Sequence, residues 1–313
     1  MNLQTAIEQL SQDDLGGIAL PIFVVAIVVE SLISKSKQLD LYRGKDFLVS
    51  MAMLIVSAVI DFLPKAIFFL VFFQLHEISP LKDVVGRQWW AWGLLFFLDD
   101  FVYYWFHRAN HEVRFFWAGH IPHHSSVKLN FGTALRQGVG ERTHKYLFWL
   151  PLPLLGFDPL MMFTVIGINL LYQFWVHTEL VHRLPRLIEF IFNTPSHHRV
   201  HHGSNIRYLD CNHGGVLIIW DRMFGTFSAE ADEEPVVYGL TKNIDTYNPA
   251  KVAFGEYANL IKDIFRATNW GDRFRYLLLA PGWSHDGKDK RAKVLRQSAI
   301  LIKAEPQARS WDT

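Results

Sequence analysis

The feature that most constrains this chain is a run of four histidines between residues 197 and 202. On a helix, His198, His201 and His202 are spaced i, i+3 and i+4, so their rings lie on one face, and His197 reaches the same side through its i+4 partner His201. Neutral imidazole is the commonest side-chain metal ligand. The alternative is a basic turn exposed at the surface. We interpret the stretch as a metal site on a helix.

A second histidine-rich stretch lies upstream. His107 and His111 are spaced i, i+4, and His120, His123 and His124 repeat the i, i+3, i+4 pattern. Structural zinc sites use about four ligands, usually with cysteine, whereas this chain has 15 histidines and one cysteine. Nine histidines in two stretches are too many for one tetrahedral ion. We therefore expect two ions sharing one site, and imidazole suits iron, zinc, copper and nickel.

The composition indicates a membrane protein. Hydrophobic residues make up 50% of the 313 residues and charged residues 19%, against about 25% charged residues in soluble domains. A net charge of +1 gives no sign of nucleic-acid binding. The single cysteine excludes a disulfide framework and fits a reducing, cytoplasmic side of the membrane.

Four apolar stretches predict the membrane-embedded helices. Residues 15–34 form the first, and no cleavable signal peptide is evident there. Residues 47–75 form either one long kinked helix or a hairpin of two short ones. A third helix covers residues 89–106. The last stretch is interpreted as a re-entrant pair, about 147–156 and 159–176, because the histidines before and after it must meet. This predicts an all-α integral membrane protein with about four to five membrane-embedded segments.

Positive charge predicts which side of the membrane holds the histidines. Lys35, Lys37, Arg43 and Lys45 follow the first helix, which indicates a cytoplasmic loop. If residues 47–75 cross the membrane once, all the histidine stretches emerge in the cytoplasm; a hairpin would place them outside. We expect a cytoplasmic helical cap that holds the dimetal site, because many basic residues surround the histidines: Arg108, Arg114, Lys128, Arg136, Arg142, Lys145, Arg183, Arg186, Arg199 and Arg207.

Two carboxylates are candidates for supporting the metal ligands. Asp100 lies two turns before His107 on the same helical face, so it is expected to accept the free N–H of that imidazole and orient the ring. The alternative is an interfacial residue that reaches water. Glu112 follows His111 and is a candidate supporting carboxylate or proton relay, while a solvated glutamate beside Arg114 is an equal alternative.

Three histidine boxes carry a resemblance to a known family. His107–His111, His120–His124 and His197–His202 resemble the boxes of the fatty acid hydroxylase / sterol desaturase superfamily, which are integral-membrane di-iron oxygenases. The likeness covers about residues 95–228. Further segments resemble the alkylglycerol monooxygenase branch and its bacterial relatives, namely Ser125–Ser126, Thr133–Gln137, Leu171–Glu179, Gly215–Asp221 and Phe224–Phe227.

The resemblance implies a ligand set. It adds His177, because the family has a histidine between its second and third boxes, and it leaves His182 and His213 as open candidates. His197 is expected to be a ligand or to support one. The predicted metal ligands are His107, His111, His120, His123, His124, His177, His197, His198, His201 and His202.

The resemblance also implies a reaction. It implies two iron ions that use O2 to insert one oxygen atom into a lipid C–H bond, which in the closest branch is at the ether α-carbon of an alkylglycerol. Because the chain has no dinucleotide-binding glycine motif, we expect a separate electron donor or a diffusible reductant, tetrahydrobiopterin in that branch.

Two alternatives remain at this stage. One is a desaturase or methyl oxidase that acts on sterols, carotenoids or fatty acyl chains with the same site. The other is a metal transporter, which would place its ligands at mid-membrane on broken helices, whereas these boxes lie in basic, less apolar stretches.

The predicted organisation has two parts. We expect residues 1–228 to form a membrane-embedded di-iron oxygenase domain, with its core at 95–228, and residues 229–313 to form a C-terminal helical extension. In that extension, residues 257–279 are predicted as amphipathic helices on the membrane surface, and residues 292–302 as a further helix. The expected location is the bacterial inner membrane, with the active site on the cytoplasmic side. The oligomeric state is not indicated.

Overall fold

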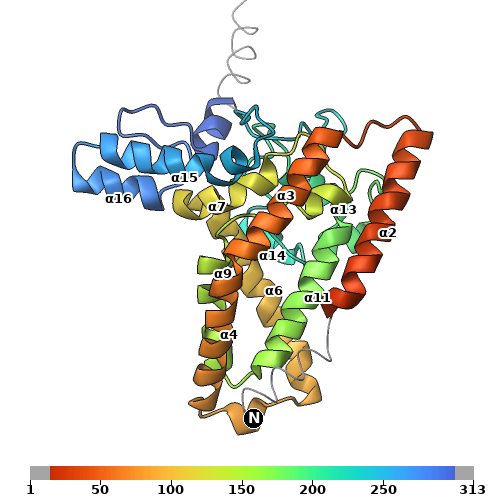
Figure 1. The fold of residues 1–313 in the computed structure, drawn as a ribbon, viewed down its shortest axis with the longest axis vertical. Helices are drawn as coiled ribbons and strands as arrows, with labels where there is room; N and C mark the ends of the chain where they lie inside the picture. Colours follow the sequence, from red (N-terminus) through yellow and green to blue (C-terminus); the bar gives the residue numbers. More distant parts are fainter. Residues whose placement is uncertain (1–14, 300–313) are drawn as a thin grey trace, which may run out of the picture.

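The computed structural model describes residues 15–299 and is built from helices (Figure 1). Within these residues the only β pairings are isolated bridges, such as Phe192 with Leu217. The all-α prediction is therefore confirmed for this part of the chain. The first 14 residues lie outside the described residues, as does the end of the helix predicted at 292–302, of which residues 292–299 are helical.

The N-terminal helices are long and apolar. Helix α2 spans Leu15–Ser36, α3 spans Gly44–Ile60 and α4 spans Phe62–Glu77. A bend of 47° separates α3 from α4, so the kinked alternative holds and the hairpin does not. The bend lies at Asp61, whose buried carboxylate accepts hydrogen bonds from Ser57 Oγ (3.0 Å) and Arg142 Nη1 (3.2 Å).

The first two histidine boxes lie on two consecutive helices. After the short α5 (Lys82–Val85), α6 runs over Trp89–Glu112 and α7 over Arg114–His124. Helix α6 is about 36 Å long at 1.5 Å per residue, six residues longer than predicted, and therefore carries His107 and His111 within its last turns. Val113 adopts an extended conformation and separates the two helices.

The segment between the second and third boxes forms the predicted pair. After α8 (Phe131–Ala134), α9 (Arg142–Trp149) and α10 (Pro151–Leu154) pack along α4. Helix α11 (Pro159–Trp175) then returns along α6, and Asp158 caps its first turn. The turn between them lies at the end of the bundle away from the histidines, where Ser79 Oγ donates to the Leu154 carbonyl (2.7 Å).

One hydrophobic core joins these helices below the histidines. Phe72 of α4, Leu95 of α6, Trp149 of α9 and Met161 of α11 are all buried in it. The indole N–H of Trp149 donates to Asp99 at 2.7 Å, so this polar group also has a partner inside the core. The core fixes α6 and α11 side by side, and both helices end at the histidines.

The remaining helices form a cap over the histidines. They are α12 (Arg186–Ile191), α13 (Pro195–His201), α14 (Ile219–Phe224), α15 (Pro249–Arg266) and α16 (Trp270–Leu278). Helices α15 and α16 pack on α7 at one side of the cap (Figure 1). Arg114 at the start of α7 binds Glu256 (3.0 Å) and Asp263 (2.7 Å) of α15. The C-terminal extension therefore supports the helix that carries the second box.

Length and hydropathy single out fewer membrane-spanning helices than the sequence predicts. Within residues 15–299, α2 is long and apolar enough to cross a membrane, α3 and α4 pass together as one bent span, and α11 is a shorter apolar helix. The count of four to five embedded segments therefore stays a prediction.

Candidate metal centre

Nine buried histidines converge in two adjacent groups. The five-histidine group consists of His107, His111, His120, His124 and His201, and the four-histidine group consists of His123, His177, His198 and His202. Within each group, one ring nitrogen of every residue lies within 4.8 Å of those of the others. The groups touch, because the rings of His124 and His202 stack at 4.5 Å between centroids. The early and late boxes therefore meet, as the sequence requires.

Helical spacing explains how the rings are divided between the groups. On α7, His120 and His124 are one turn apart and enter the five-histidine group, while His123 enters the other. On α13 and its C-cap the division is reversed: His198 and His202 enter the four-histidine group, and His201 enters the five-histidine group. Helix α6 completes the first group, and the end of α11 completes the second with His177.

Main-chain contacts at Nδ1 orient four of these nine rings. Main-chain carbonyls lie 2.7–3.0 Å from Nδ1 of four of them: His213 O for His107, Arg136 O for His123, Gln173 O for His177 and Cys211 O for His201. Carbonyls only accept hydrogen bonds, so each of these rings must carry its proton on Nδ1. Nε2 is left as a lone-pair donor, which is the arrangement found at metal-ligating histidines.

The interior of the site favours neutral imidazole. Burial and the neighbouring rings lower the pKa of His123, His124, His198, His201 and His202 well below its usual value. The Nε2 atoms of His111 and His201 are buried and have no hydrogen-bond partner among the described residues. Buried nitrogens are rarely left unpaired without a reason. Converging neutral imidazoles with free lone pairs therefore fit metal ions.

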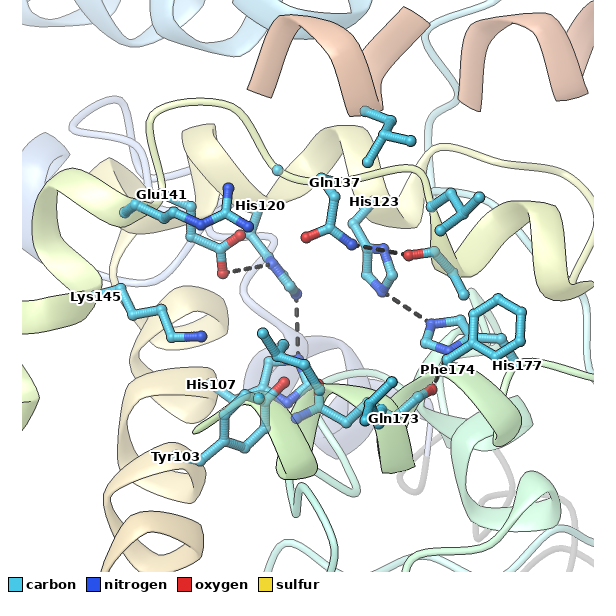
Figure 2. A pocket seen from close by; sticks show the side chains of 18 of the residues that line it. Tyr103, His107, His120, His123, Gln137, Glu141, Lys145, Gln173, Phe174 and His177 are labelled. Carbon is cyan, nitrogen blue, oxygen red and sulfur yellow. Dashed lines mark hydrogen bonds and ion pairs between the residues drawn. The ribbon is translucent and has the colours of Figure 1, made fainter. Parts of the chain in front are cut away.

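Two partly buried carboxylates, which the sequence did not single out, flank the five-histidine group. Glu141 Oε1 lies 3.3 Å from Nδ1 of His120 (Figure 2), and Asp210 Oδ1 lies 3.5 Å from Nδ1 of His111. Burial alone would raise the pKa of Glu141, but the cationic forms of neighbouring side chains, above all His120, lower it to about 2. Burial raises the pKa of Asp210 to about 7, and a cation in the group would favour its charged form.

Asp100 supports His107 by a different route from the predicted one. Its carboxylate does not contact the imidazole; it accepts hydrogen bonds from the main-chain N–H groups of Val216 (2.7 Å) and Leu217 (3.0 Å) and from the indole of Trp220 (2.9 Å). These bonds hold the loop whose His213 carbonyl faces His107. The predicted direct contact is wrong, because the loop lies between carboxylate and ring.

Gly215 allows this close approach. A Cβ at residue 215 would lie 2.8 Å from Asp100 Oδ1 and 2.7 Å from Asn169 Oδ1. Gly215 is therefore required where the loop packs against α6.

Two predicted residues lie outside the groups. His197 points the other way, with Nε2 2.9 Å from Glu189 Oε2 and Nδ1 at the N-terminus of α13. Glu112 is half-exposed and pairs with Arg108 at 2.9 Å, which matches the solvated alternative, although with a different arginine from the one considered. We assign neither of them to a metal.

His182 and His213, the two histidines left open as ligands by the sequence, differ in burial and position. His182 is exposed and belongs to neither group. His213 is fully buried, its ring centroid lies 5.0 Å from that of His111, and neither of its ring nitrogens has a hydrogen-bond partner in the described structure. It borders the five-histidine group without belonging to it.

A cavity of about 410 Å³ leads to both groups (Figure 2). His107, His120, His123, His177 and His198 lie on its inner wall. Its other walls are largely apolar and come from α2, α3 and α11, with Ala19, Phe23, Leu54, Leu170, Leu171 and Phe174 among the lining residues. The site can therefore receive an elongated apolar molecule and expose one part of it to the histidines.

Comparison with known proteins supports the resemblance carried by the boxes. The sequence model of the family described as fatty acid hydroxylase matches residues 92–226. The chain is 40% identical to alkylglycerol monooxygenase of Homo sapiens over 85% of its own length and 59% of that protein. The corresponding values for alkylglycerol monooxygenase of Danio rerio are 37%, 94% and 65%.

A less similar relative is named for a different lipid. The ornithine lipid hydroxylase OlsE of Rhizobium tropici is 31% identical over 54% of this chain and 49% of that protein. No solved structure matches the chain significantly. The chain spans less than two thirds of the length of the alkylglycerol monooxygenases that it matches. Residues 92–226, the part of the chain that is similar to the fatty acid hydroxylase family, contain all nine grouped histidines.

Proposed function

We propose that this protein is a membrane-bound di-iron monooxygenase that hydroxylates a lipid C–H bond, with the carbon next to the ether oxygen of an alkylglycerol as its preferred target. One observation carries the proposal: both histidine groups open onto a single cavity with largely apolar walls. The alkylglycerol monooxygenases among the relatives support the choice of lipid.

Two iron ions bound by the nine histidines would supply the activation of O2. One oxygen atom enters the C–H bond, and the other leaves as water after the uptake of two electrons and two protons. An external reductant, tetrahydrobiopterin or a separate redox protein, supplies the electrons. Hydroxylation beside an ether oxygen gives a hemiacetal, which divides into a fatty aldehyde and glycerol.

The side chains of this protein prepare the site for that chemistry. The Nδ1 contacts hold the rings in one tautomer, which leaves the Nε2 lone pair available to bind an ion. Burial of the rings excludes bulk water from the reacting carbon. Phe23 of α2 and Phe174 of α11 stack at 3.9 Å between ring centroids on the apolar wall and would guide the alkyl chain.

A membrane location follows from the outer surface of the same helices. Val25, Leu48, Ile55, Val59 and Phe62 on α2–α4 are each more than half exposed. Contiguous apolar surface of this kind is rare on soluble monomers. We propose that these helices lie in the cell membrane and that the histidines face the cytoplasm, because the basic residues surround the boxes.

Metal analysis and oxygen consumption test the proposal together. Purified protein reconstituted with iron and a reductant is incubated with 1-O-alkylglycerols, sterols and fatty acids. We expect about two iron ions per chain and aldehyde release from the alkylglycerols. Preferential oxidation of a sterol or fatty acid, or a protein that binds no iron, would contradict it.

A matched pair of histidine variants tests whether the grouped histidines are needed for metal binding and oxidation. His201→Ala should abolish oxidation and lower the metal content, since His201 belongs to the five-histidine group. The exposed His182 serves as the control, and His182→Ala should retain both metal and activity. Normal turnover with full iron in His201→Ala would exclude that assignment.

A further inference from the structure

The cavity that reaches the histidines also contains a buried lysine that the metal centre does not use. Lys145 lies on α9, and only 7% of it is exposed. Its ammonium points into the cavity, between Glu141 and His120 on one side and Tyr103 and His107 on the other (Figure 2). A cationic donor therefore faces the space that leads to both histidine groups.

Three aromatic rings hold this ammonium in place without neutralising it. Their centroids lie 5.4 Å (Trp149), 5.5 Å (Phe106) and 5.8 Å (Tyr103) from Nζ. Within residues 15–299, no carboxylate lies within ion-pair distance of Nζ, and no oxygen accepts a hydrogen bond from it. Lysines are almost never fully buried unless they are paired. The missing partner is therefore expected on a molecule that occupies the cavity.

Glu141 supplies an acceptor on the same wall. Its Oε1 accepts a hydrogen bond from Asn110 Nδ2 at 2.6 Å, and the carboxylate lines the cavity together with Lys145. A hydroxyl group both accepts and donates hydrogen bonds, so it can bind to an ammonium and to a carboxylate at once. A carboxylate or phosphate headgroup would be attracted by Lys145 but repelled by Glu141. Arg142 and Lys65 also line the cavity, but Arg142 pairs with Asp61 at 3.2 Å and Lys65 is exposed. The space between Lys145 and Glu141 therefore favours a neutral, hydroxylated headgroup.

We propose that Lys145, with Glu141 beside it, binds the hydroxyl groups of a neutral lipid headgroup and so determines which carbon of the lipid reaches the metal site. This inference rests on the proposed lipid oxidation. With the headgroup at α9 and the alkyl chain along Phe23 and Phe174, the carbons nearest the headgroup are the ones that face the histidines. The same hydrogen bonds would select lipids with free hydroxyls over lipids without them.

A paired-substrate experiment on the iron-loaded protein tests this role. Lys145→Met keeps the apolar stem and removes the donor. With a 1-O-alkylglycerol, KM should rise about 10- to 100-fold, as expected for loss of a hydrogen bond to a charged group. With the corresponding 1-O-alkyl propyl ether, which lacks both hydroxyl oxygens, KM should be unchanged by the substitution. The exposed Lys262→Met on α15 is the control and should alter neither value.

The outcomes separate this inference from the proposed function. Equal losses on both lipids would mean that Lys145 is only structural, and a Lys145-dependent preference for a fatty acid would mean that the site binds anions; either result overturns the proposal. Equilibrium binding of both lipids to the iron-loaded protein without reductant gives a readout that needs no turnover. A preference for the free diol that is lost in Lys145→Met supports the headgroup site even if no oxidation is found. Equal binding of both lipids by the unsubstituted protein overturns it.

Discussion

The two histidine groups differ in what surrounds them. The five-histidine group has a carboxylate near each of two rings, Glu141 and Asp210, and two carbonyls of the 211–213 loop hold two others. Among the described residues, the contacts at Nδ1 in the four-histidine group come from two main-chain carbonyls, those of Arg136 and Gln173. The five-histidine group therefore has one histidine more and two carboxylates nearby. In the described structure, no such carboxylate contact is found at the four-histidine group.

The groups also differ in access. A second cavity, of about 260 Å³, reaches His111, His124 and His201, and Lys242 and Lys290 of the cap line it. Its lining among the described residues includes none of the four-histidine group, three of whose members line the larger cavity beside α2 and α11. Both groups line the larger cavity, so they differ mainly in their surroundings, and we expect an ion in the five-histidine group to bind more tightly.

The largest expected effect comes from removing one ligand from each group. His198→Ala leaves three histidines in its group, whereas His111→Ala leaves four. We therefore expect His198→Ala to hold about one iron per chain and to lose all measurable oxidation, and His111→Ala to keep more iron. Metal content and oxygen uptake, measured side by side, check this. Equal iron loss in both variants would remove the distinction between the groups.

The next effect tests how the 213–217 loop is held. Asp100→Ala leaves the N–H groups of Val216, Leu217 and Trp220 without their buried acceptor. Each unpaired buried donor costs about 1–3 kcal/mol, so we expect the free energy of unfolding to fall by at least about 3 kcal/mol. Because the loop also holds His107, iron should be lost from the five-histidine group first. Chemical denaturation and metal titration measure the two effects, and an unchanged stability would contradict the assignment.

A smaller effect is expected when a carboxylate beside the histidines is changed rather than a histidine itself. Glu141→Gln removes the charge beside His120, and removal of such a partner typically weakens metal binding about 10- to 100-fold. Competition with a chelator gives the affinity. Glu112→Gln is the matched control, because Glu112 is half-exposed and paired with Arg108. A loss of affinity in Glu112→Gln as large as in Glu141→Gln would restore the role that the sequence suggested for it.

The grouping of the histidines could be predicted from the sequence, because helical spacing alone places His198 and His202 on one face. The return of α11 also followed from the requirement that separate boxes meet, and the kinked helix was favoured by the basic residues around the boxes. Helix ends, by contrast, were set by packing: α6 continues to Glu112 because its last turns are buried against α7 and the cap.

The supporting residues could not be found in the same way. Glu141, Lys145 and Asp210 have no periodic pattern, and their roles depend on the path of the loops after the second and third boxes. Asp100 was singled out by its depth in an apolar helix. Only the fold shows that a loop more than 100 residues away donates hydrogen bonds to its carboxylate. A buried charge in an apolar sequence predicts a partner without identifying it.

The smallest expected effect compares two neighbouring histidines. His197 and His198 are adjacent in sequence, yet His198 lies in the four-histidine group while His197 pairs with Glu189 at 2.9 Å outside it. His197→Gln should therefore keep full iron content and oxidation and lose only about 1 kcal/mol of stability with its hydrogen bond. His198→Gln should lose iron, because glutamine offers no ring nitrogen in the group. Metal analysis of both variants decides the question, and iron loss in His197→Gln would mean that this ring turns toward the ions when they are bound.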